Sequence, residues 1–421
     1  MNEAAVSKAA DRAFLPVAIV VVVGVLATSL PQTQVLGLIP LKNLLKNAMG
    51  ASSEATAAFF FWTTMPWYFK PLVGIVQDAV PLFGTRRRSY VLVFGLLSAL
   101  AWWALAATPQ DYRPFLWVCL GINIAMVTAI TAVGGYMVEA AQASASAGRL
   151  SSVRSVTEQA GFVISGPLAG LLAGIAFAWT AVICGAIAFL AVPVALWLLR
   201  EPRVAQPPGA PAQALRAAGA TLGTAVRAPS LWLAAGVALL FYFAPGTNTA
   251  QFYFEQNVLH LTTQQQGTIQ FIAGCFGVLA AFLYGAFAAR RFTLRWLLIG
   301  CIALGAAGQA AFVLYQDWNL ARVTAVLNGF GYTLADLAML HLAVKATPRG
   351  CEALGFALLM AVRNFGTFGG DWLGTVVQDH WHLGFHQLAL VNAGLSLLAI
   401  PMTLLLPRRL VGLRDAERAA A

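Results

Sequence analysis

Apolar residues occur along this chain in runs of about 20, separated by short polar connections. About 20 residues is the length that a helix needs to cross the roughly 30 Å hydrocarbon core of a bilayer. Because lipid offers backbone polar groups no partner, and the period-two alternation of a membrane β-barrel is absent, each run is predicted to be a helix. Twelve runs fit the sequence, at 13–38, 56–80, 88–107, 114–139, 151–175, 178–199, 230–253, 265–289, 294–315, 321–346, 352–377 and 386–407.

The composition agrees with a protein surrounded by lipid. Of 421 residues, 59% are hydrophobic and 10% are charged, against about 25% charged in a soluble domain. The net charge is +10, but the basic residues lie in small groups along the whole chain. We therefore expect no nucleic-acid partner. The five cysteines have no paired spacing, and we expect neither a disulfide, a metal site nor a cofactor.

The basic residues predict the topology, because cytoplasmic connections retain Lys and Arg. With the N-terminus inside, 20 of the 26 basic residues lie in cytoplasmic segments, Lys70 and Arg363 fall inside helices, and the other four, Lys42, Lys46, Arg113 and Arg322, lie outside. Both termini are therefore predicted to be cytoplasmic. The Arg-rich, Ala-rich composition favours a bacterial inner membrane.

The longest connection divides the predicted helices six and six. It carries Pro207, Pro208 and Pro211. Gly74 and the arginines after it have a weaker counterpart at Gly285, 211 residues later, as expected of a duplicated bundle. The predicted fold is an all-α polytopic membrane protein with two six-helix bundles, at 1–199 and 230–421, joined by a cytoplasmic linker at 200–229.

Two blocks resemble a known family. Residues 67–90 contain Gly74, Asp78, Gly84 and the triplet Arg86-Arg87-Arg88, which resembles the helix 2 to 3 signature of the major facilitator superfamily. The fuller string, from Trp67-Tyr-Phe-Lys70-Pro71 to Tyr90, is similar to the block that marks the folate-biopterin transporters within that superfamily. Residues 347–366, from Thr347-Pro348 through Glu352 to Asn364 and Gly366, resemble a second block of the same family.

This resemblance implies a superfamily fold and transport of a folate or a pterin. The chain departs from the family at Ile130 and Gly134, where members usually carry one or two aspartates. The predicted helix 151–175 carries Gly161, Gly166-Pro167, Gly170 and Gly174, which is similar to the Gly-Pro motif of proton-driven drug exporters. The four-residue spacing of Gly166, Gly170 and Gly174 is also typical of close helix packing. The alternative function is therefore a proton-coupled carrier or exporter of another amphipathic organic anion or drug-like compound.

Several charged residues fall inside predicted helices, where each costs about 2.5–3.5 kcal/mol and should face a wet or paired environment. Lys70 and Arg363 lie about 15 to 17 Å from the cytoplasmic ends of their helices, near midplane. We expect them to bind an anionic substrate, unless Arg363 forms a permanent ion pair with Asp336. The candidate substrate-binding residues are Lys70, Arg363, Asn364, Tyr332 and Trp67.

Transport against a gradient needs a coupled ion, and a buried carboxyl group is suited to carry a proton. The candidates are Asp336, Glu158 and Asp371. Glu158 has an alternative partner in Arg154, one helical turn earlier. Aromatic residues on the same helices, among them Trp62, Tyr68, Phe365 and Trp372, are candidates for stacking on a flat heterocycle or for packing.

A third group of charges lies at the predicted cytoplasmic ends of helices 2 and 4. Bridges between its acids and arginines would lock a gate, whereas the alternative is a set of topology-setting arginines beside a solvated acid. The candidate gating residues are Asp78, Arg86, Arg87, Arg88 and Glu139.

The sequence contains no hydrolase, metalloprotease or phosphate-loop motif, and we expect no enzymatic activity. We expect a monomeric, proton-coupled importer of folate- or pterin-type organic anions that works by alternating access.

Overall fold

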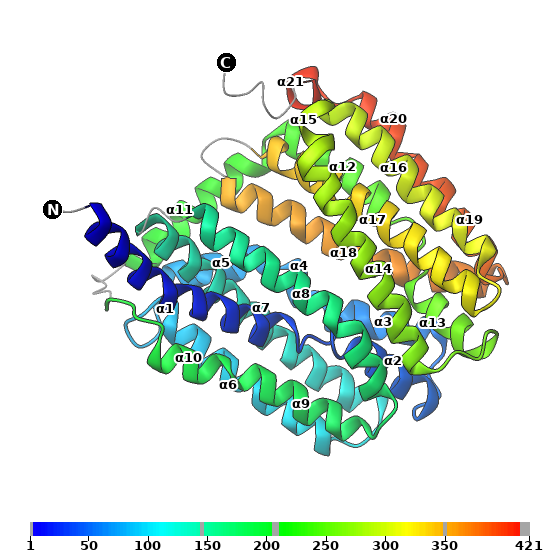
Figure 1. Ribbon diagram of the computed structural model, residues 1–421, viewed down its shortest axis with the longest axis horizontal. Coiled ribbons are helices and arrows are strands. Elements are labelled where there is room, and N and C mark those ends of the chain that lie inside the picture. The colour runs from blue at the N-terminus through cyan, green and yellow to red at the C-terminus, as the bar shows by residue number, and fades with distance from the viewer. Residues whose placement is uncertain (1–2, 144–146, 204–209, 348–351, 413–421) are drawn as a thin grey trace. The chain divides into compact units, whose positions relative to one another are not determined.

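The structure, a computed structural model, describes residues 3–143, 147–203, 210–347 and 352–412. Every regular element in these residues is a helix. The chain divides into two compact units (Figure 1): unit 1 comprises Met1–Leu44 and Phe69–Ala218, and unit 2 comprises Leu45–Tyr68 and Gly219–Ala421. The predicted domain boundaries at 199 and 230 stay a prediction.

Unit 1 is built around valine, leucine and alanine side chains from five helices. Val21 and Val25 meet Val91, Val133 and Leu150 in one buried cluster. The helices are α1 (Glu3–Ser29), α2 (Leu38–Asn47, which continues into unit 2), α5 (Lys70–Ala79), α6 (Arg88–Ala107), α7 (Tyr112–Ala143), α8 (Ala147–Ala173), α9 (Phe177–Phe189), α10 (Ala191–Trp197) and the start of α11 (Ala210–Val226).

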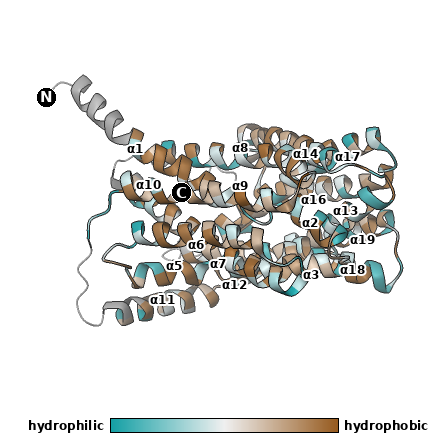
Figure 2. Ribbon diagram, turned by 90° about the horizontal axis from the view of Figure 1, so that it is seen from below, coloured by the Kyte–Doolittle hydropathy of each residue, from teal (hydrophilic) through white to brown (hydrophobic). Residues whose placement is uncertain are grey.

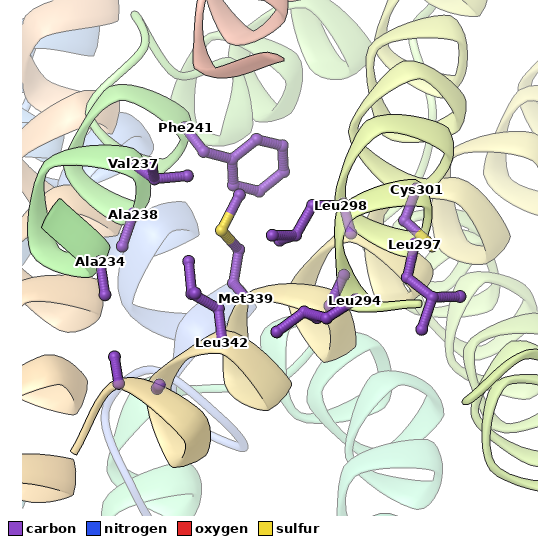
Figure 3. Packing of buried hydrophobic residues seen from close by; sticks show 14 of the residues in the cluster. Ala234, Val237, Ala238, Phe241, Leu294, Leu297, Leu298, Cys301, Met339 and Leu342 are labelled. Carbon is purple, nitrogen blue, oxygen red and sulfur yellow. The ribbon is translucent and has the colours of Figure 1, made fainter. Parts of the chain in front are cut away.

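Unit 2 has its own core, in which Phe241, Leu298 and Met339 pack together (Figure 3). Its helices are α3 (Ser53–Thr63), α4 (Met65–Tyr68), α12 (Pro229–Tyr242), α13 (Asn248–Asn257), α14 (Thr263–Leu283), η1 (Tyr284–Ala288, a π-helix), α15 (Ala289–Arg291), α16 (Leu294–Ala310), η2 (Ala311–Leu314, a 3₁₀-helix), α17 (Trp318–Ala346), α18 (Glu352–His380), α19 (Phe385–Leu397), α20 (Ala399–Leu404) and α21 (Arg408–Val411).

Seven helices in the described residues are long and apolar enough to cross a membrane, and up to eight if the bent pair α11–α12 counts as one. Figure 2 shows hydrophobic residues along α6, α9 and α16, which are among the seven. The helices α8 and α18 have 27 and 29 residues, but their apolar sequence is interrupted by charges such as Glu158 and Arg363.

The second predicted run, 56–80, is broken into α3, α4 and α5 rather than forming one helix. Pro66 and Pro71 lie at the starts of the second and third pieces, where a missing N–H does least harm. The Thr63 hydroxyl donates to the Phe59 carbonyl at 2.8 Å, and the Thr64 hydroxyl donates to the Phe60 carbonyl at 2.6 Å. The breaks put Lys70 at the first residue of a helix, not in a helix interior.

Candidate functional site

An ion pair joins α17 and α18 in unit 2. The Arg363 guanidinium donates to both carboxylate oxygens of Asp336, from Nε at 2.7 Å and from Nη2 at 3.1 Å. The side chains are 31% and 17% exposed, respectively. This fork-to-carboxylate geometry is the strongest form of a charged hydrogen bond, and it is the pairing that the sequence offered as the alternative to substrate binding.

A tyrosine from α12 completes this arrangement. The Tyr242 hydroxyl donates to Asp336 Oδ1 at 2.5 Å, and the Arg363 guanidinium lies 5.5 Å from the centre of the Tyr242 ring. Tyr332, one helical turn before Asp336, stacks on Phe241, and Asn364 is partly buried next to Arg363. Sequence reasoning missed Tyr242 because its only signal is a hydroxyl at the end of a mostly apolar helix.

A small pocket lies beside Arg363, with room for about one water molecule. Tyr242 and Arg363 supply its polar groups. The rest of its lining is apolar and comes from α12, α17 and α18: Ala234, Ala238, Met339, Leu342, Ala343, Leu359 and Met360.

The predicted run 230–253 is interrupted around Ala244-Pro245-Gly246, between α12 and α13. Its freed backbone groups find partners on neighbouring helices. Gly246 N donates to the Gly370 carbonyl at 2.6 Å, and the Asn392 amide donates to the Pro245 carbonyl at 2.9 Å. These two backbone groups at the break therefore have partners inside unit 2, as irregular backbone within a membrane protein requires.

Asp371, one of the candidate proton carriers, caps the helix that follows this break. Its carboxylate accepts from Thr249 N at 2.9 Å and from Thr249 Oγ1 at 2.6 Å. Thr249 lies in the first turn of α13, whose N–H groups have no partner within the helix and favour a negative charge. The observed contacts give Asp371 a capping role, and proton coupling through it stays a prediction.

Six aromatic residues from α3, α4, α18 and the end of α12 gather in unit 2. We call them the aromatic cluster: Phe61, Trp62, Tyr68, Phe243, Phe365 and Trp372. Ring centres lie 5.1 Å apart for Phe61 and Trp372, and 5.7 Å apart for the stacked pair Phe243 and Phe365. Trp62 and Phe365 are exposed, and the indole N–H of Trp372 is buried without a hydrogen-bond partner in the part of the chain described. Trp67, a predicted substrate residue, is instead buried.

Unit 1 contains a second group of ionisable side chains. Arg154 and Glu158 form the i, i+4 pair on α8, with Nε and Oε1 at 3.0 Å. Lys70, at the start of α5, is partly buried and interacts electrostatically with both. A Cβ atom at position 134 would lie 3.1 Å from Arg154 Nη1, so Gly134 leaves room for the guanidinium.

The candidate gating residues converge on Arg87. Its guanidinium donates to Asp78 at 2.5 Å and to Glu139 at 2.9 Å. Burial opposes the charge of Arg87, but the two carboxylates outweigh that penalty and raise the pKa of Arg87 above its ordinary value. Gly135 makes the approach feasible, because a Cβ atom there would lie 2.6 Å from Arg87 Cζ. Arg88 instead binds the carbonyls of Ala195 and Leu196, at 3.0 and 2.9 Å.

The side chain of Glu201 binds the backbone N–H groups of the arginine triplet. The carboxylate accepts from the N–H groups of Arg86, Arg87 and Arg88 at 2.7, 2.9 and 2.8 Å, at the N-terminus of α6. A carboxylate is favoured there by the helix dipole and by the unpaired N–H groups. Sequence reasoning missed Glu201, whose signal is one acid directly after the sixth apolar run.

Glu201→Gln is expected to lower the free energy of unfolding by about 1–2 kcal/mol, because the neutral amide offers only one acceptor oxygen and loses the charge. Thermal unfolding of the purified variant measures this loss. The control is Asp379→Asn, an exposed acid, which should change stability by less than about 0.5 kcal/mol. Equal effects of the two substitutions would contradict the capping role.

Residues 348–351 of the second sequence block lie outside the described residues. The described part of that block begins α18, which carries Arg363 and Asn364.

Membrane-length apolar helices with ionisable side chains inside neighbouring helices are typical of polytopic membrane proteins with a functional site in the membrane, such as transporters. A sequence profile of the BT1 family matches residues 34–420. The chain therefore belongs to the BT1 family, which confirms the resemblance to folate-biopterin transporters, and it is a transporter and not an enzyme.

One relative is the folate-biopterin transporter of Synechocystis sp., 27% identical over 386 residues that cover 88% of this chain and 77% of the relative. The crystal structures of a D-xylose-proton symporter and of the nucleoside transporter NupG share the fold. The first has a TM-score of 0.65 at 13% identity and covers 92% of this chain and 96% of the symporter. The second has a TM-score of 0.64 at 15% identity and covers 93% and 98%. This likeness confirms the predicted all-helical fold with apolar membrane-length helices, whereas the twelve helices and the two-bundle layout stay predictions.

Proposed function

We propose that this protein imports a folate- or pterin-type organic anion together with protons, by alternating access of two six-helix bundles. The observation that carries the proposal is the two-pronged ion pair between Arg363 and Asp336, in a chain whose relatives are named folate-biopterin transporters. A folate has a pteridine ring and two carboxylates, which suit cationic and aromatic side chains.

The ion pair suggests how substrate and proton are linked. In the observed state Asp336 occupies both prongs of the Arg363 fork. Protonation of Asp336 would remove its charge and release the guanidinium, which then binds a substrate carboxylate. A proton and an anionic substrate thus favour the same state, as a symporter requires.

The other candidate residues have supporting roles in this proposal. Lys70, Tyr332, Asn364 and Trp67 stay candidate substrate-binding residues. The exposed rings of the aromatic cluster are suited to stack on a pteridine. Glu158 and Asp371 stay secondary candidates for proton coupling, and the bridges of Arg87 to Asp78 and Glu139 are proposed to open and close a cytoplasmic gate.

We further propose twelve spans, in which broken helices such as α12–α13 count once. We place the monomeric protein in a bacterial inner membrane with both termini in the cytoplasm, on the basis of the basic connections.

The proposal is tested by uptake of labelled folate and biopterin into proteoliposomes with and without an inward proton gradient. We expect wild-type uptake to rise severalfold with the gradient, and Asp336→Asn to retain residual uptake without this dependence. Asp111→Asn, at an exposed position, is the control and should keep it. Full gradient dependence in Asp336→Asn would exclude Asp336 as the proton carrier. Absence of uptake of both compounds by the wild type would exclude the substrate class.

A further inference from the structure

The connection between the two halves contains a helix with three distinct faces. On α11, Ala218, Thr221 and Ala225 recur at helical spacing and are partly or fully buried. A second face carries the exposed Leu215 and Val226, with the partly buried Leu222 between them. A third face is exposed and polar, and it carries Gln213, Arg216, Thr224 and, directly after the helix, Arg227.

The direction of α11 places these faces at a membrane surface. Residues Leu215–Val226 make an angle of 71° with α12. With α12 as part of the proposed span α12–α13 and tilted by about 20°, the average for a membrane-crossing helix, α11 lies nearer to the membrane plane than to the membrane normal. Helices that lie in this plane have an apolar face beside a basic one, as α11 does.

An exposed tryptophan also indicates that α11 lies at the membrane surface. Trp232, in the first turn of α12, is 62% exposed, and its indole N–H donates to the Val226 carbonyl at the end of α11, at 2.5 Å. Exposed tryptophans of membrane proteins concentrate at the boundary between headgroups and acyl chains. The corner between α11 and α12 therefore lies at that boundary.

The positive charge of α11 and of Arg227 after it favours an anionic partner. The sequence has no acidic residue between Glu201 and Glu255, so no acid near in sequence offsets Arg216 and Arg227. We propose that α11 is an interfacial helix that binds anionic phospholipid headgroups through Arg216 and Arg227, while Leu215 and Val226 lie among the acyl chains.

The first test measures lipid binding by the full-length protein and needs no transport substrate. Native mass spectrometry of the purified protein with phosphatidylglycerol compares the wild type with the double variant Arg216→Gln, Arg227→Gln. An arginine near an anionic surface strengthens binding about fivefold, so the double variant should bind about 25-fold more weakly. Arg113→Gln, an exposed arginine outside this segment, should stay within about twofold of the wild type.

Two results would overturn the proposal in this test. One is unchanged phosphatidylglycerol binding by the double variant. The other is equal binding of phosphatidylglycerol and phosphatidylcholine by the wild type, since an electrostatic site must prefer the anionic lipid and weaken with salt.

The second test asks which face meets the acyl chains. Photoreactive benzoylphenylalanine is introduced in place of Leu215 or of Thr224, in protein reconstituted in mixed phosphatidylcholine and phosphatidylglycerol bilayers. We expect lipid adducts at position 215 to exceed those at 224 about tenfold. Equal yields at the two positions, or a higher yield at 224, would show that α11 does not lie in the interface as proposed.

Discussion

Arg363→Ala is expected to lower both uptake and stability, with the largest effect on uptake of any single charge removal in unit 2. The substitution removes the fork that holds Asp336 and leaves that carboxylate with the Tyr242 hydroxyl as its remaining partner among the contacts above. Breaking a buried ion pair from one side costs about 3–5 kcal/mol, and the partial exposure of this pair reduces the expected loss of unfolding free energy to about 2–3 kcal/mol. Loss of a charged contact to the substrate should lower uptake about 100-fold.

Two further variants separate binding from structure. Arg363→Gln combined with Asp336→Asn removes both charges, so it should regain most of the stability in thermal unfolding but not the uptake of labelled folate. Arg363→Lys keeps the charge without the fork and should retain an intermediate uptake. If the neutral pair transports as well as the wild type, Arg363 serves the structure alone and the proposed substrate role is wrong.

The apolar runs predicted helix positions well where a helix is continuous. The predicted run 88–107 coincides with α6, and 321–346 lies within α17. The backbone of a long, uniformly apolar segment can satisfy its hydrogen bonds in lipid only as a helix, so length and hydropathy suffice to place such helices. The break in 56–80 was missed because hydropathy averages over a window and weighs Pro66 and Pro71 little, although each removes an N–H donor.

The charged residues of the candidate site could be predicted from the sequence, but not all of the residues that they contact. Arg363 and Asp336 stand out because a charge inside an apolar helix is costly, and their 27-residue separation is short enough to suggest adjacent helices. The carboxylate of Asp371 and its partner Thr249 are 122 residues apart. The local sequence around Asp371 or Thr249 does not indicate their contact, because the contact depends on where the chain resumes as α13 after the break. Phe61 and Phe243 were missed for a related reason, because phenylalanine is common in every membrane helix.

Gly374→Ala is expected to be the most destabilising single-methyl change among the positions considered, although alanine usually favours a helix. Gly374 lies on α18 opposite the break between α12 and α13, and an ideal Cβ atom there would overlap the carbonyl oxygen and the nitrogen of Gly246. Both atoms belong to backbone, which cannot swing aside as a side chain does. The helices must separate, which strains the hydrogen bond from Gly246 to Gly370 and the cap that Asp371 provides.

Overpacking of this kind costs about 1–3 kcal/mol, and each strained hydrogen bond adds about 1 kcal/mol, so we expect a loss of about 3 kcal/mol of unfolding free energy. Thermal unfolding in detergent measures it. The matched control is Gly300→Ala on α16, where a Cβ atom meets nothing within 4 Å and where the change should be neutral or stabilise by up to about 1 kcal/mol. If both alanines are tolerated equally, the helices at the break are not held in contact, and the contacts of Asp371 with Thr249 do not constrain the protein in the membrane.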